Sequence, residues 1–335
     1  MKNALLLINL GTPDNTSVQA IRRYLREFLA DPRVIDLPAP LRFLLLYAVI
    51  LPFRPKRLTG AYQSIWMDEG SPLLVHSLQL QKKAQAILGA DCIVALGMRY
   101  GNPTLKEAIQ LVSTAENLCI LPLYPQYSSA ATGSSIEKCM GLLAKQPNFP
   151  FIKIIRDFYK HPSFIQAQAA LIRQQLTPDV FLLFSYHGIP VRHLKRAGCE
   201  RLCVGACPSL QDGNNSNETR CYKAQCYATT ELLAEKVGLK PHQYTTSFQS
   251  RLGKTPWIRP FTDEILVDLA KAGVKRLLVA CPAFVADCLE TEEEIGIRAQ
   301  EQWIGLGGES LALVPSLNAT DVWVQAVIDI CEIKP

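Results

Sequence analysis

The sequence places a histidine directly after an apolar run. Tyr186 and His187 follow DVFLLFS, and Gly188-Ile189-Pro190 then interrupt regular structure. A histidine at the end of a strand, backed by Gly and Pro, exposes an imidazole that can act as a base or a metal ligand near neutral pH. Because single loop histidines are commonly surface or structural residues, His187 alone identifies no reaction.

A second stretch, FVADCLETEEEIG, is rich in carboxylates. If an α-helix begins near Asp287, then Asp287, Glu290 and Glu294 fall at i, i+3 and i+7 and form a row along one face. Such a row could pass a hard divalent cation inward. The alternative is a capping box with Asp287 as N-cap and Glu290 at N3, which complements the helix dipole.

Five of the eleven cysteines lie in one stretch, at positions 199, 203, 207, 221 and 226. The stretch also contains DGNNSNE, which cannot bury much apolar surface, so we expect a metal centre to order it. Thiolates bind zinc or iron–sulfur clusters, and the spacing fits either. Free or redox-sensing thiols are the remaining interpretation.

The elements that position these residues follow an α/β pattern. Apolar runs without period-2 alternation, such as ALLLINLGTP and NLCILPLYPQYSS, alternate with helix-like segments such as SVQAIRRYLREFLA. This pattern is typical of parallel strands covered on both faces. We predict two doubly wound α/β domains, residues 1–155 and 156–335, with functional residues beyond the carboxyl ends of the strands.

Composition excludes several function classes. The net charge of +5 includes no long basic run, so no nucleic-acid partner is expected. INLGTPD has one glycine after the first run and lacks a dinucleotide fingerprint. No secretory cleavage pattern follows the N-terminus, and eleven cysteines favour a reducing compartment, so we expect a cytoplasmic protein.

Residues 41–53, LRFLLLYAVILPF, are apolar apart from Arg42, and RPKR follows them at residues 54–57. Thirteen residues are too few to span a bilayer. The segment could lie on a membrane surface with its basic cluster on anionic lipid. A buried helix or the wall of an apolar cavity is the alternative.

The chain resembles ferrochelatases, which insert ferrous iron into a porphyrin. The resemblance covers nearly the whole length through seven ordered blocks: LLLINLGTPD, YQSIWMDEGSPLL, MRYGNPTLKEAI, LPLYPQYSSAATGSS, SYHGIP, SFQSRLGKTPW and CPAFVADCLETEEEI. It implies two Rossmann-like domains of the class II chelatase fold with a porphyrin cleft between them. It also implies that residues 41–53 form an apolar lip over the active site.

The resemblance further implies Fe²⁺ insertion into protoporphyrin IX, with His187 and Glu290 as the facing proton- and metal-handling groups. Asp287 and Glu294 then stand behind Glu290 on the path of the metal. The residues expected near the macrocycle are Tyr62, Tyr100 and Trp257, and Arg54 or Arg99 is expected to pair with substrate propionates.

For the cysteines, the resemblance favours a 2Fe-2S cluster, with zinc as the alternative. The expected ligands are Cys199, Cys203, Cys207 and Cys221, with Cys226 as substitute. Because metal insertion changes no iron oxidation state, such a cluster is expected to be structural or sensory. Cys281 and Cys288 are expected to contribute to strand packing.

Three alternatives to this function stay open at the level of sequence. They are a coproporphyrin-specific ferrochelatase, another tetrapyrrole chelatase, and an iron–sulfur or haem-binding sensor on a chelatase scaffold. Porphyrin and Fe²⁺ are the expected partners, with peripheral membrane contact through residues 41–53. The chain is expected to be a monomer or a homodimer.

Overall fold

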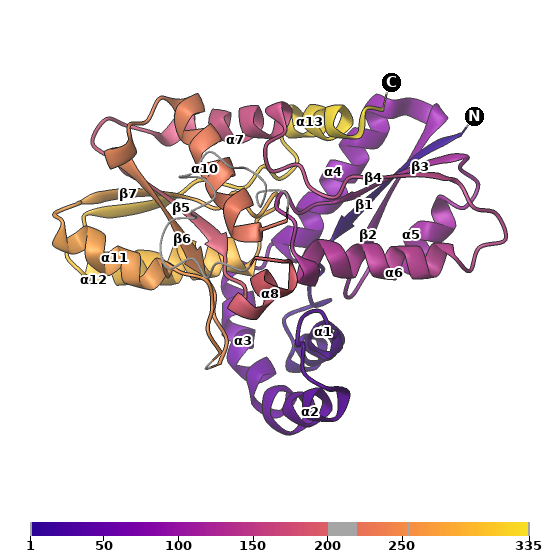
Figure 1. The fold of residues 1–335 in the computed structure, drawn as a ribbon, viewed down its shortest axis with the longest axis horizontal. Coiled ribbons are helices and arrows are strands. Elements are labelled where there is room, and N and C mark those ends of the chain that lie inside the picture. The colour runs from indigo at the N-terminus through magenta and orange to yellow at the C-terminus, as the bar shows by residue number, and fades with distance from the viewer. Residues whose placement is uncertain (1, 200–219, 254, 334–335) are drawn as a thin grey trace. The chain divides into compact units, whose positions relative to one another are not determined.

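The computed structural model describes residues 2–199, 220–253 and 255–333. They form two compact units (Figure 1). Unit 1 contains Met1–Tyr124, Ser128–Asp157 and Asn318–Pro335, and unit 2 contains Pro125–Tyr127 and Phe158–Leu317. The chain thus passes into unit 2 close to the boundary predicted near residue 155, and its last residues return to unit 1.

Unit 1 is built on a four-stranded parallel sheet in the order β2-β1-β3-β4. Its strands are β1 (Asn3–Asn9), β2 (Cys92–Met98), β3 (Asn117–Pro122) and β4 (Phe151–Ile154). Its helices are α1 (Val18–Ala30), α2 (Ala39–Leu44), η1 (Leu45–Ile50), α3 (Leu51–Ile65), α4 (Pro72–Leu88), η2 (Gly89–Asp91), α5 (Leu105–Leu111), η3 (Ser129–Gly133), α6 (Ser134–Leu143) and α13 (Asp321–Cys331).

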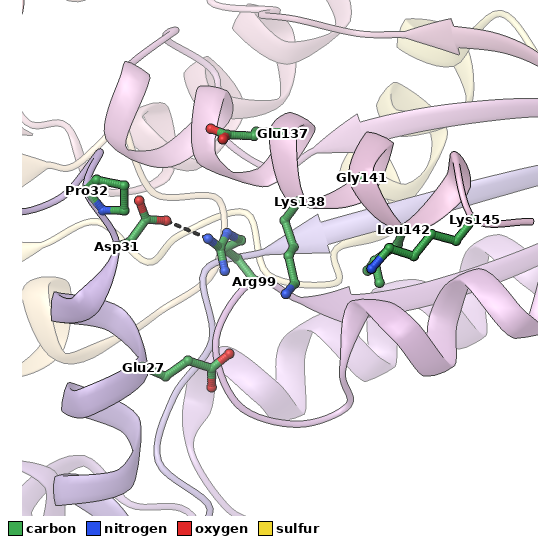
Figure 2. A pocket seen from close by; sticks show the side chains of 9 residues that line it. All are labelled: Glu27, Asp31, Pro32, Arg99, Glu137, Lys138, Gly141, Leu142 and Lys145. Atoms are coloured by element: carbon green, nitrogen blue, oxygen red, sulfur yellow. Dashed lines mark hydrogen bonds and ion pairs between the residues drawn. The ribbon is translucent and has the colours of Figure 1, made fainter. Parts of the chain in front are cut away.

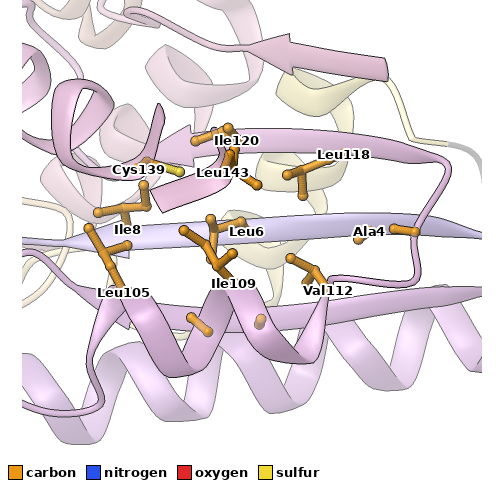
Figure 3. Close-up of a cluster of buried hydrophobic side chains, with 13 residues drawn as sticks. Ala4, Leu6, Ile8, Leu105, Ile109, Val112, Leu118, Ile120, Cys139 and Leu143 are labelled. Atoms are coloured by element: carbon orange, nitrogen blue, oxygen red, sulfur yellow. The ribbon is translucent and has the colours of Figure 1, made fainter. Parts of the chain in front are cut away.

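Strand β1 explains why the apolar runs lack alternation. Ala4, Leu6 and Ile8 pack in a core cluster with residues of α5 and α6 (Figure 3). Leu5 and Leu7, which point to the opposite face, are also fully buried. Both faces of the sheet are therefore covered by apolar contacts, and the predicted doubly wound arrangement is confirmed for this unit.

The C-terminal helix α13 belongs to unit 1, whereas the sequence-based division placed it in the second domain. It contacts α4, and Trp323 within it is fully buried. The Lys83 ammonium donates to Ala319 O at 2.8 Å, and that of Lys153 donates to Cys331 O at 3.1 Å. These contacts join segments far apart in sequence, which local patterns do not encode.

Unit 2 repeats the architecture with the parallel order β6-β5-β7-β8. Its strands are β5 (Phe181–His187), β6 (Tyr244–Gln249), β7 (Arg276–Ala280) and β8 (Ser310–Leu313). Its helices are α7 (Pro162–Gln175), α8 (Val191–Arg196), α10 (Tyr222–Val237), η5 (Pro241–Gln243), α11 (Thr262–Lys271), η6 (Leu289–Ala299) and α12 (Gln300–Gly305). Helices α11, η6 and α12 pack on one face of this sheet, and α7 and α10 lie on the other (Figure 1).

The apolar segment 41–53 forms α2, the π-helix η1 and the start of α3. Leu46, Ile50 and Leu51 are buried. Six large apolar side chains are instead 45–63% exposed: Leu41, Phe43, Leu44, Tyr47, Val49 and Phe53. The interpretation of this segment as a buried helix is therefore wrong for these six residues. No helix of the described residues has the length and apolarity needed to cross a membrane.

Candidate active site

His187 is the last residue of β5, at the carboxyl end of the sheet of unit 2. Its Nδ1 lies 2.5 Å from Gly188 O. Because a carbonyl oxygen only accepts hydrogen bonds, Nδ1 carries the proton and Nε2 keeps its lone pair. The Tyr222 hydroxyl donates to His187 O at 2.8 Å and holds the strand end in place. The half-buried imidazole thus offers one basic nitrogen.

The glycine after His187 is required by close backbone contacts. A Cβ at Gly188 would lie 2.8 Å from Ser250 O and 2.9 Å from Gln249 O, which is too close for any side chain. The same Cβ position lies 3.4 Å from the Trp257 ring. The half-buried Trp257 ring therefore lies beside the backbone of Gly188, one residue after His187.

The acidic stretch forms a π-helix, η6, from Leu289 to Ala299. A helix begins at Leu289, close to the predicted start near Asp287, but it has π turns and Asp287 precedes it, so the α-helical i, i+3 and i+7 spacing of the three acids does not apply. The N-cap is Cys288, whose backbone N–H donates to Thr291 Oγ1 at 2.9 Å. The capping box proposed for Asp287 and Glu290 is therefore also wrong, by one residue.

Asp287 precedes η6 and is 8% exposed. Its Oδ1 accepts a hydrogen bond from Ser316 N at 2.8 Å. Burial, together with the negative charge of Asp287, raises the pKa of Glu292 above its usual range. Sequence reasoning did not select Glu292, because α-helical spacing points it away from Asp287.

Glu290 and Glu294 differ in their surroundings. Glu290 is half-buried, and within the described residues its carboxylate makes no ion pair. Burial, with the adjacent Glu290 charge, raises the pKa of the Cys288 thiol well above its usual range. Glu294 instead accepts from Ser250 N at 3.0 Å and from Ser250 Oγ. Of the predicted row, Glu290 is the carboxylate best placed to meet a cation.

In unit 1, Arg54 and Tyr62 both lie on α3. Tyr62 is 6% exposed, and its ring packs edge-on against Trp66 with the centroids 6.2 Å apart. Burial lowers the pKa of Arg54, which the nearby Tyr62 partly offsets. Arg54 forms no ion pair within the described part of the chain, so its desolvated guanidinium is suited to an external carboxylate.

Arg99 and Tyr100 follow β2 and are held internally. Arg99 Nη2 donates to Asp31 Oδ2 at 2.5 Å (Figure 2). The Tyr100 hydroxyl donates to the same oxygen at 2.8 Å. The Ser134 hydroxyl donates to the same oxygen at 2.6 Å. Burial alone would raise the pKa of Asp31. The hydrogen bonds from Ser134, Tyr100 and the Arg33 backbone lower this pKa, and so does the positive charge of Arg99.

Tyr100 is fully buried in this cluster, and burial raises the pKa of its hydroxyl far above the usual range. A hollow of about 410 Å³ lies beside the Asp31–Arg99 pair, and Lys138 of α6 and Lys145, two residues past the end of that helix, also line it. The structure thus gives Arg99 and Tyr100 a protein partner, Asp31, that sequence reasoning did not identify.

The described cysteines of the candidate cluster are Cys199, Cys221 and Cys226; Cys203 and Cys207 lie outside the described residues. Cys199 is half-exposed after α8, and Cys221 is buried at the N-cap of α10. Cys226 is fully buried within α10, and burial raises the pKa of its thiol well above the usual range.

The other two cysteines near the candidate site differ from each other. Cys281 belongs to the core cluster on the sheet of unit 2, in agreement with the expected strand packing. Cys288 instead caps η6. Across residues 2–199, 220–253 and 255–333, no three His, Cys, Asp or Glu side chains are grouped so that they could hold a metal ion.

Comparison with known proteins gives one family. A family model described as ferrochelatase matches residues 2–334. The chain is 54% identical over 327 residues to the ferrochelatase of Legionella pneumophila (strain Corby), covering 98% of each chain. It is 50% identical over 331 residues to the ferrochelatase of Coxiella burnetii (strain CbuG_Q212), covering 97% of this chain and 92% of that one.

Two solved structures share the fold. SirB from Bacillus subtilis with Fe³⁺ is similar with a TM-score of 0.56 and 12% identity, over 99% of this chain and 95% of that chain. The sirohydrochlorin chelatase SirB from Bacillus subtilis subspecies spizizenii, in complex with cobalt, gives a TM-score of 0.54 and 10% identity, over 99% and 94%. At these identities the likeness concerns the fold alone, and it agrees with the predicted α/β class.

Proposed function

The chain belongs to the ferrochelatase family, and we propose that it inserts Fe²⁺ into protoporphyrin IX with His187 as base and Glu290 as metal-handling group. It is a metal chelatase of haem biosynthesis. The overall step is balanced: two pyrrole N–H protons leave the macrocycle, and one divalent iron takes their place. A base and a cation-binding group are both needed. The base removes the pyrrole protons, and the cation-binding group delivers the iron, as the bonds between iron and the pyrrole nitrogens form.

The contact between His187 Nδ1 and Gly188 O, which sets the tautomer of the imidazole, is the observation that carries this proposal. Nδ1 is engaged by Gly188 O, so Nε2 is the nitrogen free to take a pyrrole proton. The ring cannot turn freely, since Gly188 is itself fixed by its close approach to the backbone of Gln249 and Ser250. The base is therefore held in one orientation before substrate binds.

Glu290 supports the metal-handling role through its lack of an ion-pair partner in the described chain. An oxygen ligand binds Fe²⁺ weakly enough for the softer porphyrin nitrogens to capture it. Asp287 and Glu294 are proposed to stand behind it on the path of the metal, although both already accept backbone hydrogen bonds. Their carboxylates contribute negative charge along that path.

Trp257 and Arg54 are proposed to bind the porphyrin. The Trp257 indole Nε1 donates to Leu252 O at 3.0 Å, which fixes a flat apolar ring beside the loop of His187. Arg54 is preferred over Arg99 for a propionate, because Arg99 already pairs with Asp31. Tyr62 lies close enough to Arg54 to affect its pKa and is proposed to border the same carboxylate.

The test of function is anaerobic incubation of the protein with Fe²⁺ and either protoporphyrin IX or coproporphyrin III, following the loss of free-porphyrin fluorescence. We expect catalytic turnover with protoporphyrin IX and a slower rate with coproporphyrin III. Glu290→Gln should lower kcat more than it weakens porphyrin binding. An equal loss in both quantities would remove Glu290 from the chemistry, and the absence of turnover with both porphyrins would contradict the function.

The cysteine segment is proposed to bind a 2Fe-2S cluster through Cys199, Cys203, Cys207 and Cys221. The thiolate donor set fits such a cluster chemically. Cys226, whose thiol is fully buried inside α10, stays the substitute ligand. The cluster would take no part in insertion, which changes no iron oxidation state.

The cluster proposal is tested by quantifying iron and acid-labile sulfide in protein purified without oxygen. Two irons and two sulfides per chain are expected, with loss of both in Cys221→Ser and retention in Cys226→Ala. Stoichiometric zinc without sulfide would support the alternative centre. Retention of the cluster in Cys221→Ser would overturn the ligand set.

The exposed apolar side chains of α2, η1 and the start of α3 are proposed to contact the cytoplasmic face of an anionic membrane. Arg54, Lys56 and Arg57 follow them closely and supply the matching charge. We expect co-sedimentation with vesicles containing phosphatidylglycerol, and its loss in Phe43→Ser/Leu44→Ser. Leu111→Ser, which changes an equally exposed residue of α5, is the control and should still sediment.

A further inference from the structure

We propose that Gln249 is a positioning residue that sets the placement of His187 relative to Glu290. The inference rests on the proposed function, because it assigns Gln249 a purpose only if those two groups share one reaction. Gln249 ends β6, is 3% exposed, and reaches both segments at once. Neither the seven sequence blocks nor the acidic pattern distinguishes it from an ordinary buried strand residue.

The backbone of Gln249 fixes the His187 side of the site. Strands β5 and β6 pair in parallel with His187 opposite Gln249. Gly188 N donates to Gln249 O at 2.6 Å. Since His187 Nδ1 bonds to the carbonyl of this same Gly188, the orientation of the imidazole depends directly on where Gln249 lies.

The side chain of Gln249 holds the backbone of η6 at Glu290. Its Nε2 donates to Glu290 O at 2.6 Å, in the first turn of the π-helix. Its Oε1 accepts from Ser185 Oγ at 2.7 Å, and the Cys281 thiol lies 3.6 Å away. The amide cannot be reversed, because its oxygen would then face the Glu290 carbonyl and two acceptors would meet.

A chain of buried hydroxyl groups supports this orientation. Ser247 Oγ and Thr262 Oγ1 lie 2.9 Å apart, as do Thr262 Oγ1 and Ser185 Oγ. Each hydroxyl has one hydrogen, and Gln249 Oε1 only accepts, so the donors run from Ser247 through Thr262 and Ser185 to Gln249. A fully satisfied buried network of this kind is rigid and resists rotation of the amide.

The neighbouring Ser250 makes the same attachment one turn further along η6. It adopts φ of 62°, in the left-handed region, and both its N–H and its hydroxyl donate to Glu294. Two consecutive residues at the end of β6 therefore hold the π-helix at Glu290 and Glu294. A displacement of η6 relative to β5 requires these bonds to break.

The test compares Gln249→Met with Thr246→Val in Fe²⁺ insertion into protoporphyrin IX. Gln249→Met keeps the volume and the backbone bonds and removes only the amide. We expect kcat to fall on the order of 10- to 100-fold, the cost of a misplacement near 1 Å. Porphyrin stoichiometry and KM should change less than about 3-fold by the same reasoning. Thr246→Val, which changes a buried residue of the same strand whose hydroxyl bonds to Thr230 and not to the Gln249 network, should keep wild-type kcat.

Three results would overturn the positioning role. They are a kcat in Gln249→Met within about 3-fold of wild type, a loss of kcat matched by an equal loss of porphyrin-binding sites, and an equal loss of kcat in Thr246→Val. If Gln249→Met does not fold, Gln249→Asn decides, since it keeps the amide but is too short to reach Glu290 O. Failure of the wild type to insert iron would instead contradict the proposed function.

Discussion

At the scale of single residues, partners that are distant in sequence determine which side chains remain available to bind a substrate. Arg99 and Arg54 are equivalent in the sequence as candidate carboxylate binders. Arg99 pairs with Asp31, 68 positions away, whereas Arg54 has no acidic partner in the described chain. No sequence spacing encodes that difference. His187 could be predicted, because its position depends only on where one apolar run ends.

Asp31→Asn tests the buried cluster of unit 1. Because the folded-state pKa of Asp31 lies below its ordinary 3.8, the ionised carboxylate stabilises the fold above that pH. We expect a loss of about 3 kcal/mol in the free energy of unfolding at pH 7. The difference from wild type should shrink as the pH falls below about 4, since Asp31 then takes up a proton in the unfolded chain before it does so in the folded protein. Urea unfolding at pH 7 and at pH 3.5 measures both values, and a pH-independent difference would contradict this assignment.

Glu292→Gln should raise the free energy of unfolding, whereas Asp31→Asn lowers it. Its folded-state pKa is raised above 4.5, so its ionised form is penalised in the fold, and this cost disappears at pH values below 4.5. The variant should be more stable than wild type at pH 7, by less than about 1 kcal/mol because water screens a half-buried carboxylate. The two proteins should be equally stable at pH 4. A less stable variant at pH 7 would show that Glu292 is a favourable charge.

At the scale of elements, the sequence predicts the strands better than the helix of the site. The apolar runs correspond to β1, β3, β5 and β7, because burial on both faces leaves a clear signal. The acidic helix was predicted as α-helical, since propensity and i, i+3 spacing do not distinguish α from π turns. The attachment of η6 to Gln249 and Ser250 depends on β6, which is distant in sequence.

Gly188→Ala tests the junction between β5 and β6. The added methyl would overlap two carbonyl oxygens, so we expect a loss of about 1–3 kcal/mol in stability. Turnover should fall as well, because His187 bonds to the displaced peptide. Gly305→Ala in α12 is the matched control: its Cβ meets nothing within 4 Å, and helix propensity favours alanine. Thermal unfolding of both variants measures their stability. Equal stability of Gly188→Ala and Gly305→Ala would show that the junction tolerates a side chain.

At the scale of the whole molecule, each unit is built on a parallel four-stranded sheet. His187 lies at the carboxyl end of β5, whereas Arg54 and Tyr62 lie on α3. The sequence predicts this doubly wound class from the alternation of apolar runs and helical segments. It does not predict the return of α13 to unit 1, because that depends on contacts with α4 and Lys153. The family comparison adds the reaction, which fold class alone does not determine.

The central claim is that His187 Nε2 removes the pyrrole protons. The most direct measurement compares wild type with His187→Ala in anaerobic Fe²⁺ insertion, with porphyrin-binding stoichiometry measured on the same samples. The account predicts full porphyrin binding by both proteins and turnover by the wild type alone. Near-normal turnover in His187→Ala would contradict it and remove His187 from the mechanism.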